Sequence, residues 1–499
     1  MILLALHSLS ALAMLVFLAL FYLHNAPGWT NLGALLILSC TYGTLVVIAS
    51  PRLPLANLLR LSPVFTRTLY LSGLVILPWV FLEAAVLDYY QPLSLFDDAI
   101  IALAVSWTLL LAAIVLALVK GDTRLVLAVM IALLGPLLAQ GLPSITNPQP
   151  SSRAIVHNDL FVGGVGGYDI YRIPALLVIP AGSALADGEI LIGDRQLVIV
   201  EARRDGALDT GVIDLVQRYS DDDGDSWSDP EVICRHEIGD ARGKCGNATP
   251  VFDSQAGRVW LAYNLSGIPK DLPEGPRPHS SHLMYSDDGG LSWQGQRKLP
   301  FENLVFGPGH GIQKVHAPHV GRLLIPGNRN GSSETIFSDD GGATWNLGQA
   351  LGAGNENEIA ELSDGRLYMA SRHNLPIGRP PEPNGRLYAI SSDGGFSWGE
   401  HQRELAQPTP ICQASIESDK QGSLWFSNPA HHKARVHLTL RRSDDDGESW
   451  PVALELYRGP AGYSQLGLLT DNQLAVVYER GIMAYSERIS YARLSADLD

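Results

Sequence analysis

An eight-residue string recurs five times in the second part of this 499-residue chain. Its pattern is Ser-x-Asp-x-Gly-x-Ser/Thr-Trp, and the copies begin at Ser220, Ser286, Ser338, Ser391 and Ser443. Their starts are 66, 52, 53 and 52 residues apart. A period near 50 residues is typical of propellers and solenoids, in which each repeat is one supersecondary unit. The repeat therefore restricts this part of the chain to an array of similar units.

The residues of the string favour a tight turn between two strands. Its Asp and Ser side chains can bond backbone amides of the turn, its Gly residues permit positive φ, and its Trp can cover the turn as an apolar plug. Short alternating runs with Gly-containing turns, such as 258–264 and 365–371, lie between the copies and predict β-strands. About 350 residues at roughly 50 to 60 per unit predict an all-β, six-bladed β-propeller with four strands per blade, one blade lacking a recognisable copy.

The first part of the chain has a different composition. Five apolar runs of about 20 residues, the length that crosses a bilayer core, lie at 2–23, 32–50, 69–88, 99–119 and 124–142. We therefore expect residues 1–143 to form an α-helical transmembrane region of about five spans. Residues 144–153, which are rich in proline, are the expected linker, and residues 154–499 are the expected propeller.

The charged loops predict the orientation of this region. Loop 51–68 carries three arginines and no acid, and loop 120–124 carries Lys120 and Arg124, so both should face the cytoplasm. Loop 89–98 carries Asp97 and Asp98 and no base, so it should face out. Five spans then place Met1 inside and the propeller on the periplasmic or extracellular side of the inner or cell membrane. The lipid bilayer is thus an expected partner.

Net charge argues against a nucleic-acid partner. The chain carries a formal charge of −15, and residues 1–150 contribute five acidic and five basic residues. The whole excess of acid therefore belongs to residues 151–499, and bulk electrostatic attraction to a polyanion is excluded.

The recurring string resembles the Asp box of the sialidases, also called the BNR repeat. Further stretches resemble that family in chain order: Tyr171-Arg-Ile-Pro174, Glu201-Ala-Arg203 followed by Leu208-Asp209, Asn355-Glu-Asn-Glu-Ile-Ala-Glu-Leu362, Arg372, Ser427-Asn-Pro before Arg435, Ala461-Gly-Tyr463 and Val477-Tyr-Glu479. The resemblance covers about residues 155–495. It implies a retaining exo-α-sialidase that releases terminal α-linked sialic acids from glycoproteins, glycolipids or oligosaccharides, without a cofactor or metal.

The resemblance assigns a role to each of these side chains. Three arginines would hold the sugar's carboxylate with planar forks of donors; they are Arg172, Arg372 and Arg435. Tyr463 would be the nucleophile, because a neutral phenol approaches an anomeric carbon bearing a carboxylate more easily than an anionic side chain does. Glu356 would take the proton of Tyr463, and Asp209 would serve as general acid and then as general base.

Two supporting roles and several alternatives remain. Glu479 is expected to hold Arg172 in place, and Arg203 is expected to lie beside the acid. Glu358 and Glu361 are alternatives to Glu356, and Asp205 and Asp214 are alternatives to Asp209. Glu358 stands where the family commonly has Gln, and it should add negative charge near the site.

Cysteine and histidine usage adds little. Cys234 and Cys245 could pair in an oxidising periplasm, although spacing alone leaves this open. No Cys/His cluster has the spacing of a zinc site.

Three other functions compete with the sialidase hypothesis. A hydrolase for Kdo or another nonulosonic acid of lipopolysaccharide would use the same chemistry, because Kdo is also a 2-keto sugar acid. A trans-sialidase would need an acceptor site. A non-catalytic, glycan-binding propeller is the least favoured, because the catalytic set is complete in the sequence.

Overall fold

A computed structural model of the chain describes residues 155–495, except 207, 210, 239–240, 268–278, 374–384, 433 and 483. The predicted spans in 1–143 and the linker at 144–153 lie outside the described residues. Within the described part, all elements are β-strands, and no helix there is long and apolar enough to cross a membrane. The all-β class predicted for this part is confirmed.

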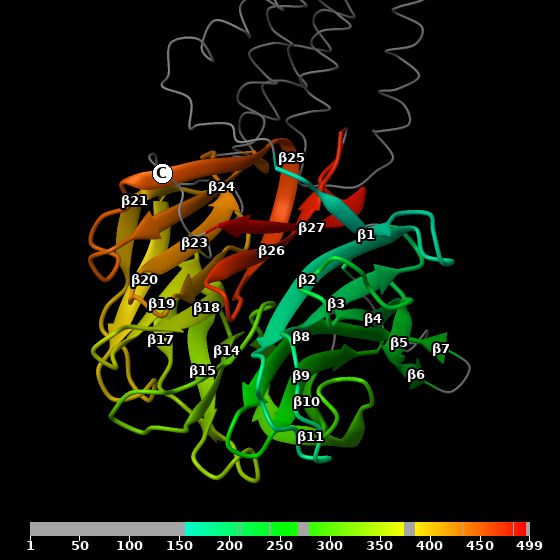
Figure 1. The fold of residues 1–499 in the computed structure, drawn as a ribbon, viewed down its shortest axis with the longest axis horizontal. Coiled ribbons are helices and arrows are strands. Elements are labelled where there is room, and N and C mark those ends of the chain that lie inside the picture. The colour runs from blue at the N-terminus through cyan, green and yellow to red at the C-terminus, as the bar shows by residue number, and fades with distance from the viewer. Residues whose placement is uncertain are drawn as a thin grey trace, which may run out of the picture. The chain divides into compact units, whose positions relative to one another are not determined.

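Apart from one two-stranded pair, hydrogen bonds join the strands into four sheets. The two largest sheets each divide at one place, within the long strand Val452–Leu468 and at the single parallel pair Ile213–Lys244, into two antiparallel groups. The resulting six groups are called here the first to sixth sheets (Figure 1). The first sheet holds β2 (Ile170–Ile179), β3 (Arg195–Arg203), β4 (Ile213–Ser220) and β5 (Glu231–Cys234). The second holds β8 (Lys244–Asp253), β9 (Arg258–Ser266), β10 (His279–Ser286) and β11 (Gln294–Glu302). The third holds β12 (Leu304–Phe306), β13 (Ile312–Gln313), β14 (Leu323–Arg329), β15 (Ser332–Ser338), β16 (Asn346–Leu347) and β17 (Leu351–Ala353).

The remaining sheets follow in chain order. The fourth holds β18 (Asn355–Glu361), β19 (Leu367–Arg372), β20 (Gly385–Ser391) and β21 (Gln402–Pro408). The fifth holds β22 (Ser415–Ser418), β23 (Leu424–Pro429), β24 (Val436–Ser443) and the first half of β25 (Val452–Leu468). The sixth holds the second half of β25, β26 (Gln473–Arg480), β27 (Arg488–Ser495) and β1 (Asn158–Val162). A short pair, β6 (Glu237–Ile238) and β7 (Ala241–Arg242), lies between the first two sheets in sequence.

The inner strands of the six sheets contact one another in a closed cycle. Contacts run from β2 to β8, β13, β18, β22 and β25, and from β25 back to β2. Six clusters of buried apolar side chains fill the spaces between consecutive sheets, including the space between the sixth sheet and the first. Because each sheet buries both faces against a neighbour, the hydrophobic core is divided around the cycle.

The strand that completes the sixth sheet comes from the beginning of the described chain. β1 pairs antiparallel with β27, with Asn158 opposite Tyr491 and Val162 opposite Arg488. Asp159 strengthens this pairing through ion pairs with Arg480 and Arg488 at 2.8 and 3.0 Å. Residues far apart in sequence therefore close the cycle.

Each copy of the repeated string begins at the last residue of a strand (β4, β10, β15, β20 or β24) and forms a tight turn. In the copy after β15, Ser338 Oγ accepts a hydrogen bond from Gly342 N at 2.8 Å, and Asp340 Oδ1 accepts one from Thr344 N at 2.8 Å. Trp345 is buried and donates its indole N–H to Gly342 O. Gly342 has a φ of 87°, which a side chain would strain. The predicted turn chemistry is confirmed.

Removal of the serine hydroxyl from one turn is expected to destabilise the fold. In Ser338→Ala, the buried N–H of Gly342 loses its acceptor, and the free energy of unfolding should fall by about 1–3 kcal/mol. Ser392 lies at a variable position of the fourth copy and is exposed, so Ser392→Ala should stay within about 0.5 kcal/mol of wild type. Urea titration followed by tryptophan fluorescence measures both, and equal stability of the two variants would contradict this account.

Candidate active site

Three of the predicted site residues, Tyr463, Glu356 and Arg372, are in mutual contact. Tyr463 lies on β25 and is 5% exposed, and its hydroxyl donates a short hydrogen bond to the carboxylate of Glu356 on β18. Arg372, the last residue of β19, donates from Nη1 to Glu356 at 2.5 Å and to Tyr463 Oη at 3.3 Å. The fourth and sixth sheets thus supply a tyrosine, a carboxylate and a guanidinium in mutual contact.

Burial and charge set the protonation of this pair. Burial and the negative charge of Glu356 raise the pKa of Tyr463 well above its ordinary value. Burial also favours a neutral Glu356, but the charge of Arg372 and the hydrogen bond from Tyr463 outweigh it and lower the pKa of Glu356. The resting pair is therefore a neutral phenol that donates to a carboxylate, which is the arrangement of a nucleophile beside its base.

Two further arginines lie over the same ring. The Cζ atoms of Arg172 and Arg435 are 5.1 and 5.3 Å from the ring centroid of Tyr463. Both also lie over the ring of Tyr485, at 4.9 and 4.8 Å. The structure thus brings the three predicted arginines together from β2, from the end of β19 and from the position just before β24. Tyr485 belongs to none of the matched stretches, and its position in the loop between β26 and β27 gave no sequence signal.

Glu479 on β26 has no exposed surface and holds two parts of the site. It accepts from Arg172 Nε at 3.0 Å and Nη2 at 3.3 Å, as the sequence predicted. It also accepts from the backbone N–H groups of Ile173 at 2.9 Å and Tyr463 at 3.1 Å. One carboxylate therefore fixes an arginine and the backbone of the tyrosine together.

β-Bulges turn these side chains toward one another. The register of β2 shifts between Arg172 and Ala175, that of β18 between Asn355 and Asn357, and that of β25 between Ala461 and Ser464. Glu356 itself has a φ of 21°, in a region that favours glycine. Bulges re-aim side chains and are frequent beside active sites, and alternation along a strand does not predict them.

Asp209 lies in the loop between β3 and β4, with 69% of its side chain exposed. Its Oδ1 is 2.7 Å from Arg203 Nη2 and 3.9 Å from Arg172 Nη1. Partial burial of Asp209 favours the neutral acid, but the exposure of its side chain to solvent weakens this contribution to its pKa. The positive charges of Arg203, Arg172 and Lys244 outweigh it and lower the pKa of Asp209 to about 2.

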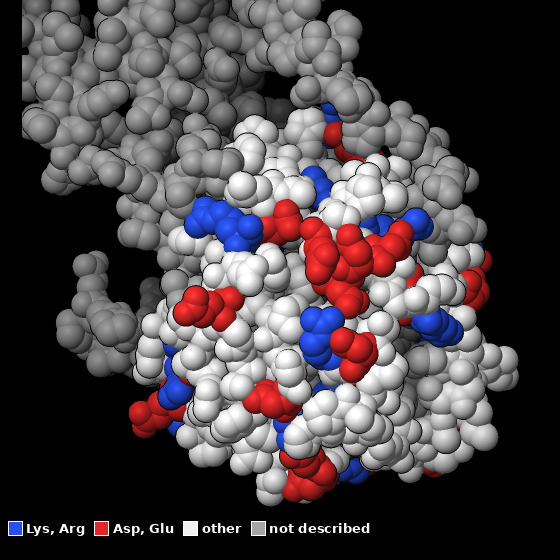
Figure 2. Space-filling model, turned by 90° about the vertical axis from the view of Figure 1, so that its left-hand side faces the viewer, with Lys and Arg blue, Asp and Glu red and all other residues white. Residues whose placement is uncertain are grey.

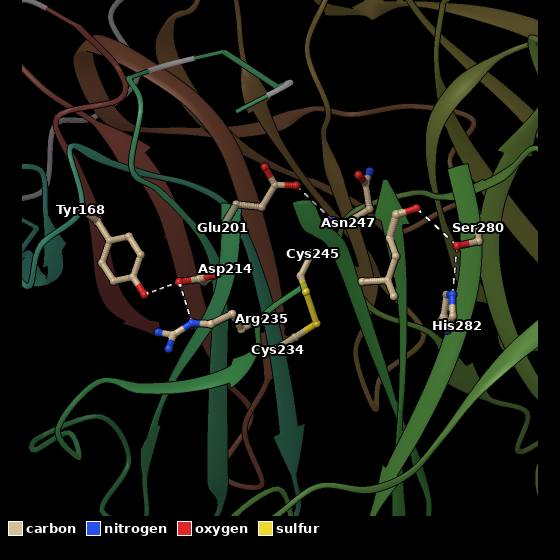
Figure 3. The surroundings of a disulfide bond; sticks show 10 residues. Tyr168, Glu201, Asp214, Cys234, Arg235, Cys245, Asn247, Ser280 and His282 are labelled. Atoms are coloured by element: carbon tan, nitrogen blue, oxygen red, sulfur yellow. Dashed lines mark hydrogen bonds and ion pairs between the residues drawn. A yellow bond between two sulfur atoms is a disulfide. The ribbon is translucent and has the colours of Figure 1, made fainter. Parts of the chain in front are cut away.

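Buried partners fix the arginine beside Asp209. Arg203 donates to Glu201 at 2.7 Å, and Glu201 also pairs with Lys244 at 3.1 Å and accepts the backbone N–H of Asn247 at 3.1 Å (Figure 3). Glu201 and Lys244 lie outside the set of side chains predicted for the site, although Glu201 is part of a matched stretch. Glu201 had a sequence signal, its place at the start of the matched stretch Glu201-Ala-Arg203, whereas Lys244 had none in the matched stretches.

The alternative aspartates have other partners. Asp205 caps the N–H of Val212 at 3.3 Å within its own loop. Asp214 is buried, accepts the hydroxyl of Tyr168 at 2.7 Å and pairs with Arg235 (Figure 3). Of the three candidates, Asp209 is the one in contact with Arg172.

The alternative glutamates of β18 also have other partners. Glu361 pairs with Lys314 at 2.6 Å, at the far end of the strand. Glu358 is buried and bonded by Gln413 at 3.3 Å and by the N–H of Ile416 at 3.1 Å. Burial raises the pKa of Glu358 well above its ordinary value, against the hydrogen bonds that it accepts, and so favours the neutral acid. A neutral Glu358 would resemble the Gln that sialidases commonly have at this position, and it would not add the negative charge expected from the sequence.

Cys234 and Cys245 form a disulfide with a Cα–Cα distance of 6.1 Å, which joins β5 to β8 and so the first sheet to the second (Figure 3). Among the described residues, no three His, Cys, Asp or Glu side chains are grouped as metal ligands. Basic side chains stand beside acidic ones on the face shown in Figure 2.

The comparisons with known proteins agree on one family. The model of the BNR repeat-like domain matches residues 197–490. A sialidase of Micromonospora viridifaciens is 30% identical over 69% of this chain, and the chain spans 55% of that relative. An exo-alpha-sialidase of Aspergillus fumigatus is 28% identical over 62% of this chain and 79% of its own length.

Solved structures show the same fold. The Hadza microbial sialidase Hz136 matches with a TM-score of 0.57 at 21% identity, over 68% of each chain. The intramolecular trans-sialidase from Ruminococcus gnavus matches with a TM-score of 0.56 at 18% identity, over 68% of this chain and 97% of that one.

The raised pKa of Glu358 predicts a pH-dependent stability. The folded chain keeps a proton that the unfolded chain loses above its pKa of 4.5, so stability falls as the pH rises above 4.5. In Glu358→Gln this loss should disappear, so the variant's melting temperature relative to wild type should increase from pH 4.5 to pH 8. Glu302 is exposed, and Glu302→Gln should show no such trend. A constant difference for Glu358→Gln would mean that Glu358 is ionised in the folded protein.

Proposed function

The chain belongs to the BNR repeat-like family, and we propose from that premise that it is an exo-α-sialidase that hydrolyses terminal α-linked sialic acids with retention of configuration. The observation that carries the proposal is the Tyr463–Glu356 hydrogen bond, surrounded by Arg172, Arg372 and Arg435. A tyrosine that donates to a carboxylate beneath three guanidinium groups suits a sugar whose anomeric carbon bears a carboxylate.

The three arginines bind the carboxylate of the sugar and set its orientation. Arg172 is held by Glu479 at two points, so its remaining donors face the site from a fixed position. Arg372 connects this anion site to Glu356 and Tyr463. The anomeric carbon next to the bound carboxylate is thereby directed toward Tyr463 Oη.

Cleavage then takes two steps. Tyr463 Oη forms a bond to the anomeric carbon while its proton passes to Glu356, and the glycosidic bond breaks as Asp209 protonates the leaving oxygen. In the second step Asp209 removes a proton from water, which attacks the anomeric carbon. Tyr463 leaves and regains its proton from Glu356, and two inversions give net retention.

Substrate binding prepares Asp209 for the first step. In the resting site the positive charges of Arg203 and Arg172 keep Asp209 ionised. A substrate carboxylate on Arg172 offsets one of these charges, so the pKa of Asp209 rises when a proton is needed. Arg203 stays beside Asp209 and stabilises the carboxylate that forms after proton transfer.

We also propose a six-bladed propeller on an anchored chain. The cycle of inner strands and the six cores between consecutive sheets support the propeller. The five apolar runs before residue 143 support a membrane anchor. The disulfide and the charges of the predicted loops support a periplasmic or extracellular location for residues 154–499.

A hydrolase for Kdo or another nonulosonic acid is the second candidate. The predicted membrane region favours it, because that region would hold the site near lipid-linked sugars such as those of lipopolysaccharide. A fluorogenic α-sialoside, tested on the full-length protein in detergent, separates the two. Turnover supports the sialidase, whereas release of Kdo from lipopolysaccharide without turnover of the sialoside supports the alternative.

Loss of the nucleophile should abolish turnover. Tyr463→Phe removes the attacking oxygen and should lower kcat about 10³-fold or more. Tyr388 stacks on Tyr368, and its hydroxyl bonds Gln402 outside the site. Tyr388→Phe should therefore keep kcat within about twofold. Initial rates on the fluorogenic α-sialoside measure both, and an active Tyr463→Phe would refute the assignment of the nucleophile.

Loss of the acid should depend on the leaving group. Asp209→Asn cannot protonate the leaving oxygen, so kcat/KM for a sialyllactose should fall about 10²- to 10⁴-fold. The leaving oxygen of an aryl sialoside with an acidic phenol needs less protonation, so kcat/KM for this substrate should fall much less. Asp205→Asn is the matched control in the same loop. Any fall in kcat/KM that it causes should be equal for the two substrates. The same loss on both substrates in Asp209→Asn would exclude Asp209 as the acid.

A further inference from the structure

A buried arginine that the mechanism does not use lies beneath the nucleophile pair. Arg386 is near the start of β20 and has no exposed surface. Its Nη1 donates to the carbonyl of Cys412 at 2.8 Å, and its Nη2 donates to the carbonyl of Glu356 at 3.2 Å. One guanidinium group thus connects the fourth sheet to the segment that precedes β22.

Both carbonyls belong to the surroundings of the reacting atoms. Glu356 occupies a bulge with a φ of 21°, a conformation that persists only where its surroundings fix it. Cys412 packs with Tyr463 and Ile173 in a small buried cluster. Arg386 therefore holds the peptide of the base and also the segment against which the ring of the nucleophile rests.

We propose that Arg386 is a positioning residue for the Glu356–Tyr463 pair, acting through the carbonyl groups of Glu356 and Cys412. This inference rests on the proposed function for the chemistry of that pair. Arg386 keeps the strained peptide of Glu356 in the orientation that directs its carboxylate at Tyr463 Oη. Arg386 has no exposed surface, and its guanidinium group acts on the site through these two carbonyl groups.

The physical chemistry of the position requires a forked donor. Burying a guanidinium group is unfavourable, because the charge is desolvated, and burial lowers the pKa of Arg386 to about 10. An apolar side chain would fill the space without that cost, but it would leave two buried carbonyls without a donor. Lys has a single donor head and cannot span both carbonyls in the geometry of a planar fork.

Two substitutions in the full-length protein test the proposal. Arg386→Met should lower kcat on the α-sialoside about 10²-fold, because a displacement of about 1 Å costs that much. KM should stay within about threefold, because Arg172, Arg372 and Arg435 remain. Arg386→Lys keeps the charge and one bond and should lose about tenfold in kcat.

A buried arginine in the next sheet is the matched control. Arg441 lies on β24, donates to Asn428 at 3.1 Å, and has a pKa that burial lowers to about 10. Arg441→Met should keep kcat within about twofold at a comparable loss of melting temperature. A wild-type kcat in Arg386→Met, or an equal loss of kcat in Arg441→Met, would overturn the proposal. If Arg386→Met does not fold, a wild-type kcat in Arg386→Lys would overturn it.

Crystal structures separate this inference from the proposed function. If the wild-type protein turns over no sialoside, the proposed function fails, but the positions of Glu356 and Tyr463 can still be compared in wild type and Arg386→Lys. Loss of the Glu356–Tyr463 hydrogen bond in the variant supports positioning by Arg386. An unchanged hydrogen bond overturns it.

Discussion

The buried carboxylate of Glu479 joins the first and sixth sheets at the point where the cycle of strands closes. It receives the guanidinium of Arg172 from β2 and the N–H groups of Ile173 and Tyr463. Without Glu479, the two backbone N–H groups would lose this acceptor, and Arg172 would keep, among the described acidic side chains, only the distant Asp209 at 3.9 Å as a partner. Loss of a buried partner is costly for backbone groups and more so for a charge. The contact that closes the fold is therefore also the contact that places an arginine beside the tyrosine. Folding and assembly of the site are the same event here.

The features predicted from sequence are those whose physics is local. The turn that begins at Ser338 is stabilised by hydrogen bonds within eight residues, so the eight-residue sequence alone predicts it. The disulfide could not be decided, because it depends on β5 lying beside β8. Alternation places Glu356 and Glu358 on one face of a strand, yet a bulge separates their environments. Tyr485 and Arg386 contact residues that are distant in sequence, and neither belongs to the repeat or to a matched stretch, so the sequence did not predict them.

The repeated turns and the candidate site lie at opposite ends of the strands. The repeated turns lie at the C-terminal ends of β4, β10, β15, β20 and β24, and the turn at 391–398 thus begins at the last residue of β20. The site is built at the opposite end, where Arg372 ends β19 and Arg386 begins the same β20. Because β19 and β20 are antiparallel, one hairpin carries residues of the candidate site at one end and a stabilising turn at the other. Strain at Glu356 is thus kept away from the turns that stabilise the sheets.

The pairing of β1 with β27 bears on how the protein is made. Asp159 and its partner Ser490 are 331 residues apart, so at about 5–20 residues per second β1 leaves the ribosome roughly 20 to 60 s before β27 exists. During that time the sixth sheet lacks its last strands, and its apolar faces stay uncovered. Loop-closure entropy makes such distant pairing slow. The sixth sheet would therefore need protection by chaperones until the hairpin of β26 and β27 is synthesised.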